Sequence, residues 1–204
     1  MPIANHPKNH GDTLIEVLFA MAVFSLVAVS SMSIMNQGTA TSQRALEITL
    51  VRQEMNAQAE TLRFINASYI MRYESGKTSY PSTPADEWIK IKAKADNDVS
   101  ELDIECSIPD DGFVLNTHTA KFANPSGLSK PKGATTFSQV VYNNANVITA
   151  VEGIWIEAIK SPNGDVPENR ANYVDFHIRA CWASPGQSVP MTLGTIVRLY
   201  EPRG

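Results

Sequence analysis

The sequence predicts an α+β protein in which one long N-terminal helix, apolar at first and amphipathic further on, packs on a C-terminal antiparallel β-sheet. Three patterns support this prediction. They are an uncharged apolar run early in the chain, an apolar stripe of helical period after it, and three alternating segments near the C-terminus. The helix and the sheet each have one apolar face, and burying those faces against each other gives one core.

The apolar run covers residues 17–35 and contains no charged residue. As one helix, with a rise of about 1.5 Å per residue, it matches the roughly 30 Å hydrocarbon core of a bilayer. Asp12 and Glu16 stand directly before it. A carboxylate in hydrocarbon costs about 2.5–3.5 kcal/mol on insertion scales, so an acid at this place needs a role or a partner.

Three interpretations of this segment compete. A secretory signal peptide has a basic start and an apolar stretch of about 7–15 residues. Here Asp12 and Glu16 offset Lys8 and the amino terminus, and the run is longer. A plain signal anchor would give Glu16 no special role. The third interpretation is a short polar leader, a glycine, and then an acid near the start of a membrane helix.

The third arrangement resembles the N-terminal segment of the type IV pilin and pseudopilin family. The resemblance rests on Gly11 followed by DTLIEVLFAMAVFSLVAV, with Glu16 fifth after the glycine. It implies that a prepilin peptidase cuts after Gly11 on the cytoplasmic side and methylates the new amino terminus at Asp12. It also implies that Glu16 is an acid of the filament core that acts in assembly. Mature chains of that family usually begin with Phe or another apolar residue, whereas this one would begin with Asp12.

The resemblance also implies a division of the chain. Residues 1–11 would be the leader, 12–36 the hydrophobic half of the helix, 37–74 its amphipathic half and 75–204 a β-rich globular head. The protein would be a single-pass protein of the inner (cytoplasmic) membrane before assembly and part of an extracellular filament afterwards. Its partners would be other pilin subunits, the peptidase and the membrane.

The amphipathic half has apolar side chains at helical spacing and no proline between residues 36 and 73. One side of this helix would carry Ile48, Val51, Met55, Ala59, Leu62, Ile65 and Tyr69. The charged residues between them are expected to be solvated: Arg44, Glu47, Arg52, Glu54, Glu60 and Arg63. The stripe predicts packing on the chain's own domain. A coiled coil with a partner is the alternative, but the heptads are too few to favour it.

Beyond residue 74 the pattern changes to short segments separated by Gly/Ser/Pro-rich turns. EWIKIKA (87–93) alternates weakly, and SELDIECSI (100–108) and GFVLNTHTAKF (112–122) have the composition of short strands. Three later segments alternate better: residues 146–160, 172–183 and 191–202. They predict an antiparallel sheet half buried against the helical stripe.

Cys106 and Cys181 both lie beyond the apolar run. If that part is outside the cell, the oxidising setting permits a disulfide between them, worth about 4 kcal/mol in a loop-entropy model. Cys181 alternates opposite to Val174 and Phe176, so it is not expected to be an ordinary core residue. Two separate thiols are the alternative.

Composition and motifs argue against several functions. A net charge of −4 without a Lys/Arg cluster disfavours nucleic-acid binding. No G-x-S-x-G, H-E-x-x-H, C-x-x-C or P-loop pattern occurs, and His118 and His177 are the only histidines beyond the leader. The acidic run at 96–103 lacks the spacing of an EF-hand and is typical of a solvated turn. We therefore predict no enzyme, no cofactor and no metal site.

These observations together predict a structural subunit, either a major or a minor one, of a type IV pilus-like filament or pseudopilus. A single-pass anchored extracytoplasmic binding domain that forms no filament is the alternative, and an anchored enzyme is less favoured than either. Processing at Gly11 belongs to the first class only.

Overall fold

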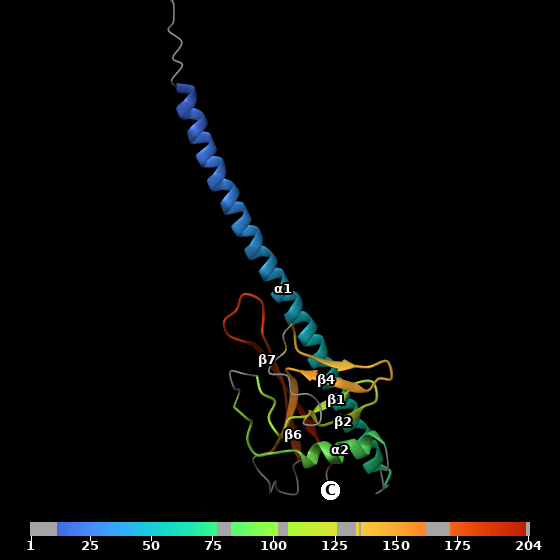
Figure 1. Cartoon of the computed structure of the whole chain (residues 1–204). Helices are drawn as coiled ribbons and strands as arrows, with labels where there is room; N and C mark the ends of the chain where they lie inside the picture. The colour runs from blue at the N-terminus through green and yellow to red at the C-terminus, as the bar shows by residue number, and fades with distance from the viewer. Residues whose placement is uncertain are drawn as a thin grey trace, which may run out of the picture. The chain divides into compact units, whose positions relative to one another are not determined.

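The computed structural model describes residues 12–76, 83–101, 106–125, 134, 136–161 and 172–202. Figure 1 shows the helices and strands, coloured from blue at the N-terminus to red at the C-terminus. The chain divides into two units, Met1–Gln43 and Arg44–Gly204.

Helix α1 extends over Asp12–Glu74, as the sequence predicts. Its residues in the first unit form an apolar helix whose side chains are exposed from Leu14 onward, except the half-buried Ala28 and Ala40. Three serine hydroxyls of this part, those of Ser25, Ser30 and Ser31, donate to the carbonyl oxygens four residues earlier, each at 2.8 Å. Such a bond satisfies the hydroxyl within the helix, so the serine is compatible with an apolar surrounding.

In the second unit, α1 contributes the apolar stripe predicted from the sequence. Val51, Leu62 and Ile65 are fully buried, and Met55 and Ala59 are nearly so. They belong to one core cluster together with residues of every strand pair and of the second helix. The stripe therefore packs on the chain's own domain.

The largest sheet consists of β5 (Ile154–Lys160), β6 (Tyr173–Trp182) and β7 (Met191–Tyr200), in the order β5-β6-β7. Both pairs are antiparallel, and the register between β6 and β7 runs without a break. The inner side chains of β6 are all buried: Val174, Phe176, Ile178, Ala180 and Trp182. The predicted C-terminal antiparallel sheet, half buried against a helix, is confirmed.

The smaller sheets are two hairpins. The first pairs β1 (Val114–Asn116) with β2 (Lys121–Ala123), and the second pairs β3 (Gln139–Tyr142) with β4 (Ile148–Glu152). The single strand expected at 112–122 is therefore wrong. The chain turns between β1 and β2 because the Asn116 side chain accepts the backbone N–H groups of the next turn, at 3.0 and 3.1 Å.

The continuous strand expected at 146–160 is also two strands, β4 and β5, which belong to different sheets. Gly153 separates them with a φ of 58°, in the left-handed region that favours glycine. The backbone oxygen of Gly153 accepts the N–H of Cys181 at 2.7 Å. A turn residue between two sheets thus also bonds to the end of β6.

The segment 87–93, which alternates only weakly in the sequence, lies in helix α2 (Pro84–Ala93). Proline stands in its first turn, followed by Asp86 and Glu87, and Lys90 and Lys92 lie in its last turn. This order suits the helix dipole and the missing proline N–H. The buried apolar residues are spaced three apart: Ala85, Trp88 and Ile91. For the segment 100–108, residues 102–105 lie outside the described part, and Cys106–Ile108 are not in a strand.

Buried polar side chains connect the elements. The amide of Gln58 on α1 donates to the carbonyl oxygen of Leu115 and accepts its N–H, both at 2.9 Å, as a neighbouring strand would. Glu87 accepts the N–H of Phe122 at 2.9 Å and so connects α2 to β2. Each of these groups finds a partner inside the core, so its burial costs little.

Candidate functional site

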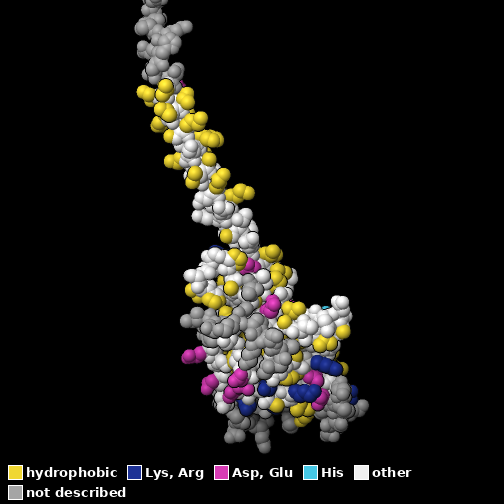
Figure 2. Space-filling view, in the orientation of Figure 1, with side chains coloured by type: hydrophobic (Ala, Val, Ile, Leu, Met, Phe, Trp, Pro, Cys, Tyr) yellow, Lys and Arg dark blue, Asp and Glu magenta, His cyan; other side chains and the backbone are white. Residues whose placement is uncertain are grey.

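The candidate site with the clearest physical signature is the first part of α1. An 18-residue window of this helix has a mean hydropathy of 2.2 and no buried residue, so α1 is long and apolar enough to cross a membrane. Phe19 and Phe24 are 72 % and 71 % exposed. Figure 2 shows hydrophobic side chains along this stretch on the face in view. A surface of this kind needs lipid or protein to cover it.

Glu16 lies in this apolar segment, one turn after the start of α1 at Asp12, and its side chain is exposed. No cation of the described residues lies within ion-pair distance of it. A carboxylate near a helix N-terminus is stabilised by the helix dipole, which explains why it is compatible with the helix itself. Gly11, the expected cleavage position, lies outside the described residues.

Cys106 and Cys181 form a disulfide in the structure, with their Cα atoms 5.6 Å apart. Both residues are buried. The bridge joins the loop before β1 to the end of β6, at the side of β6 opposite Phe176. It therefore fixes a segment that has no strand partner of its own over Cys106–Ile108.

Replacing Cys106 with serine is expected to lower the free energy of unfolding by about 2–4 kcal/mol, the usual effect of losing a native disulfide. Urea unfolding of the purified chain, followed by tryptophan fluorescence, measures this loss. Ser107→Ala, at the exposed neighbouring position, is the matched control and should be close to neutral. Equal stability of Cys106→Ser and the parent would contradict a structural role for the bridge.

One charged residue that the sequence places in solvent has a different role. Glu47 is half buried, and its carboxylate accepts the Trp182 indole N–H at 3.0 Å and the Ser184 hydroxyl at 2.7 Å. This acid therefore connects α1 to the end of β6. The expectation that Glu47 is solvated is therefore wrong. The helical pattern could not show these contacts, because Trp182 and Ser184 are far from Glu47 in the sequence.

Glu54, also expected in solvent, is half buried. Burial raises the pKa of Glu54 above its ordinary value of 4.5, while the Gln58 hydrogen bond and His118 act in the opposite direction. The folded chain therefore binds this proton more tightly than the unfolded chain. The ionised carboxylate costs stability, and the cost appears as the pH rises above about 4.5.

Glu54→Gln should accordingly raise the melting temperature at pH 7 by about 1–3 °C, and the gain should disappear below pH 4.5. Differential scanning fluorimetry across this pH range checks both statements. Glu60→Gln, at an exposed position of the same helix, is the control. A gain of the same size at pH 4 and pH 7 would rule out ionisation as its cause.

The histidines and the acidic run do not converge on a common site. His118 packs edge-on against Tyr142 with ring centroids 4.6 Å apart, and His177 lies on β6, facing Glu157 on β5 in the strand register. Burial, followed by the charge of Arg179, lowers the pKa of His177. Asp96 accepts the backbone N–H of Asn97 at 2.7 Å. Within the described ranges, no three His, Cys, Asp or Glu side chains gather as a metal site would require.

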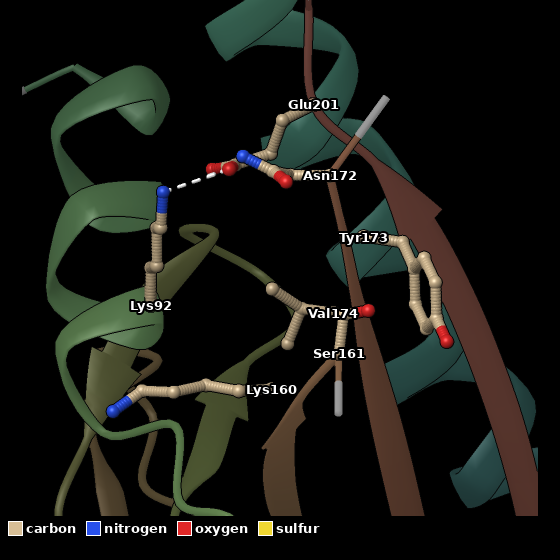
Figure 3. A pocket seen from close by; sticks show the side chains of 7 residues that line it. All are labelled: Lys92, Lys160, Ser161, Asn172, Tyr173, Val174 and Glu201. Atoms are coloured by element: carbon tan, nitrogen blue, oxygen red, sulfur yellow. Dashed lines mark hydrogen bonds and ion pairs between the residues drawn. The ribbon is translucent and has the colours of Figure 1, made fainter. Parts of the chain in front are cut away.

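A small hollow of about 190 Å³ lies beside the C-terminal half of α2. Figure 3 shows Lys92 and Lys160 on one side of it and Asn172 with Glu201 on the other, above Val174. Lys92 Nζ lies 2.7 Å from Glu201 Oε2, and Glu201 Oε1 also accepts the Trp88 indole N–H at 3.2 Å. The ion pair between Lys92 and Glu201 connects α2 to the chain after β7. This structural role explains why the two charged side chains lie at the hollow.

Comparison with known proteins agrees with the N-terminal geometry. Residues 7–32 match the family model described as the prokaryotic N-terminal methylation motif. The matched range contains Gly11, Asp12, Glu16 and most of the apolar run. No curated protein and no solved structure matches the chain.

This motif is the signal of the type IV pilin family. The N-terminal segment is therefore similar to that of type IV pilins and pseudopilins, and the long N-terminal helix with a C-terminal antiparallel sheet agrees with this similarity. The motif indicates a structural protein rather than an enzyme.

Proposed function

We propose that the protein is a subunit of a type IV pilus-like filament or pseudopilus, assembled through the first part of α1. The exposed apolar side chains of this helix support the proposal most strongly. They need lipid before assembly and neighbouring helices afterwards, because water cannot cover so large an apolar surface without cost. In this proposal the precursor spans the inner membrane once, and the assembled subunit is extracellular.

Processing is the first step of the proposed route. A prepilin peptidase cuts after Gly11, and the new amino terminus at Asp12 is methylated. The other partners are further pilin subunits, whose apolar helices surround this one in the filament. Glu16 then lies among those helices, where an unpaired carboxylate is costly and a paired one is tolerated.

Asp12 supports a minor role within such a filament. By family resemblance, Glu16 pairs with the free amine at the first mature residue of a neighbouring subunit. In this chain the Asp12 carboxylate stands beside that amine and partly neutralises it, which weakens its attraction for Glu16. A subunit with a weaker assembly contact fits a low-copy position or the filament tip better than the bulk.

The test is the identity of the mature amino terminus. We expect the chain to begin at Asp12, and Gly11→Val to leave the full-length precursor in the membrane. Mass spectrometry of protein from membranes and from sheared filaments measures both. Asn9→Ala, within the same leader, is the control and should be processed normally. A mature chain that keeps the residues before Asp12 would contradict the proposal and favour a plain membrane anchor.

A further inference from the structure

Strand β7 forms one edge of the three-stranded sheet, and its outer side carries unpaired backbone groups. Asn66 on α1 donates to the carbonyl oxygen of Tyr200 at 3.2 Å, so the backbone of Tyr200 points away from β6. Alternate residues of a strand point to the same side. The backbone groups of Thr192, Gly194, Ile196 and Arg198 therefore also point outward, and among the described residues they have no hydrogen-bond partner.

From Thr192 to Arg198 this edge lacks the usual protection against strand pairing, whereas at Tyr200 the side chain of Asn66 on α1 covers it. Natural edges are interrupted by proline, lysine or a bulge. The ten residues of β7 include no proline and no lysine, and their register with β6 is unbroken. The one charged side chain, Arg198, bonds to both carboxylate oxygens of Asp175 at 2.7 Å. Ile196 and Tyr200, on the same face as Arg198, are 60 % and 54 % exposed.

A hollow of about 290 Å³ lies on the other face of the edge, beside α1. Arg52, Met55 and Asn56 line it from the helix, and Leu193, Gly194 and Thr195 line it from the strand. Thr195 is exposed there, although it alternates with the buried side chains of β7. No carboxylate of the described residues lies within ion-pair distance of the Arg52 guanidinium.

These features define the chemistry of an added strand. A residue opposite Thr195 would direct its side chain toward α1, and an acidic one would meet Arg52. Its two neighbours would point to the other face, where apolar side chains would contact Ile196. Strand addition gains affinity from backbone hydrogen bonds and specificity from such alternation.

We propose that the outer edge of β7 binds an extended segment of another protein as an additional strand. The segment carries an acidic side chain toward Arg52 and apolar side chains beside Ile196 and Tyr200. The proposal does not depend on filament assembly, because it concerns only residues of the second unit.

The test uses the full-length chain in detergent and a fluorescent eight-residue peptide in which valine and threonine alternate, with glutamate in place of one central threonine. Fluorescence anisotropy should show saturable binding, and lysine in place of the glutamate should weaken it about tenfold or more. Arg52→Glu should reverse the preference so that the lysine peptide binds better. Arg63→Glu, exposed on the same helix but outside the hollow, should leave the preference unchanged.

A second pair of variants tests the backbone contact. Gly194→Pro removes an outward N–H without removing a bond to β6, and it should abolish binding of the glutamate peptide. Gly194→Ala should keep most of the binding, and circular dichroism verifies that both variants fold.

Three results would overturn the proposal. The first is absence of binding at about 1 mM peptide, the limit of a weak specific contact. The second is a charge preference that is the same in Arg52→Glu as in the parent, or binding that persists in Gly194→Pro. The third is a dimer of the full-length chain that Gly194→Pro dissociates, because the edge would then belong to a second copy.

Discussion

Replacing Gly153 with alanine should destabilise the second unit by more than about 4 kcal/mol, a loss found only for severe core or backbone changes. A Cβ atom at this position would lie 2.0 Å from the carbonyl oxygen of Cys181, which is backbone and cannot move away alone. The φ of 58° adds strain for any side chain. Relieving both would separate β4 from β5 or break the bond between Gly153 and Cys181.

Urea unfolding of the purified chain measures this loss, and near-UV circular dichroism shows whether packing around Trp182 changes. Gly194→Ala is the matched control. It lies on β7 at a φ outside the left-handed region, and the nearest contact of an added Cβ atom would be the ordinary 3.9 Å to the Ile178 oxygen. Similar stability of Gly153→Ala and Gly194→Ala would contradict the steric argument.

The sequence predicts the elements whose pattern is long and local. The stripe of α1 repeats over several turns, and β6 alternates over ten residues, so each period is clear without knowledge of the neighbours. Helix α2 has ten residues, and its exposed Ile89 between Trp88 and Ile91 imitates the alternation of a strand. Its type depends on Pro84 and on docking against β2 and Glu201, which a short window does not contain.

The candidate sites divide in the same way. The N-terminal segment is contiguous, so Gly11, Asp12 and Glu16 can be recognised from their spacing alone. The role of Glu47 cannot be recognised in this way, because Trp182 and Ser184 contact it only in the folded chain. The free edge of β7 likewise cannot be predicted from the sequence. The alternating pattern predicts a strand there, but it does not predict which strand lies at the edge of the sheet.

Glu16→Leu should leave membrane insertion and cleavage after Gly11 intact, yet reduce the protein in sheared filaments at least about tenfold. Within the proposed filament, Glu16 pairs with the amine of a neighbouring subunit among apolar helices. Removing one partner of a buried ion pair costs about 3–5 kcal/mol, which is more than a tenfold change in incorporation. Quantitative immunoblots of membrane and filament fractions measure the distribution.

The companion variant is Asp12→Phe, which removes the carboxylate beside the same amine and should leave incorporation unchanged or increase it. Both changes make the segment more apolar, so a general effect of charge on insertion would act in the same direction in both variants. Opposite responses of these two acids, which are only four residues apart, would therefore indicate a specific assembly contact at Glu16. If both variants enter filaments as well as the parent, Glu16 is not an assembly contact. A membrane anchor with an incidental acid would then explain the segment better, because replacing an acid near the membrane interface removes no specific contact.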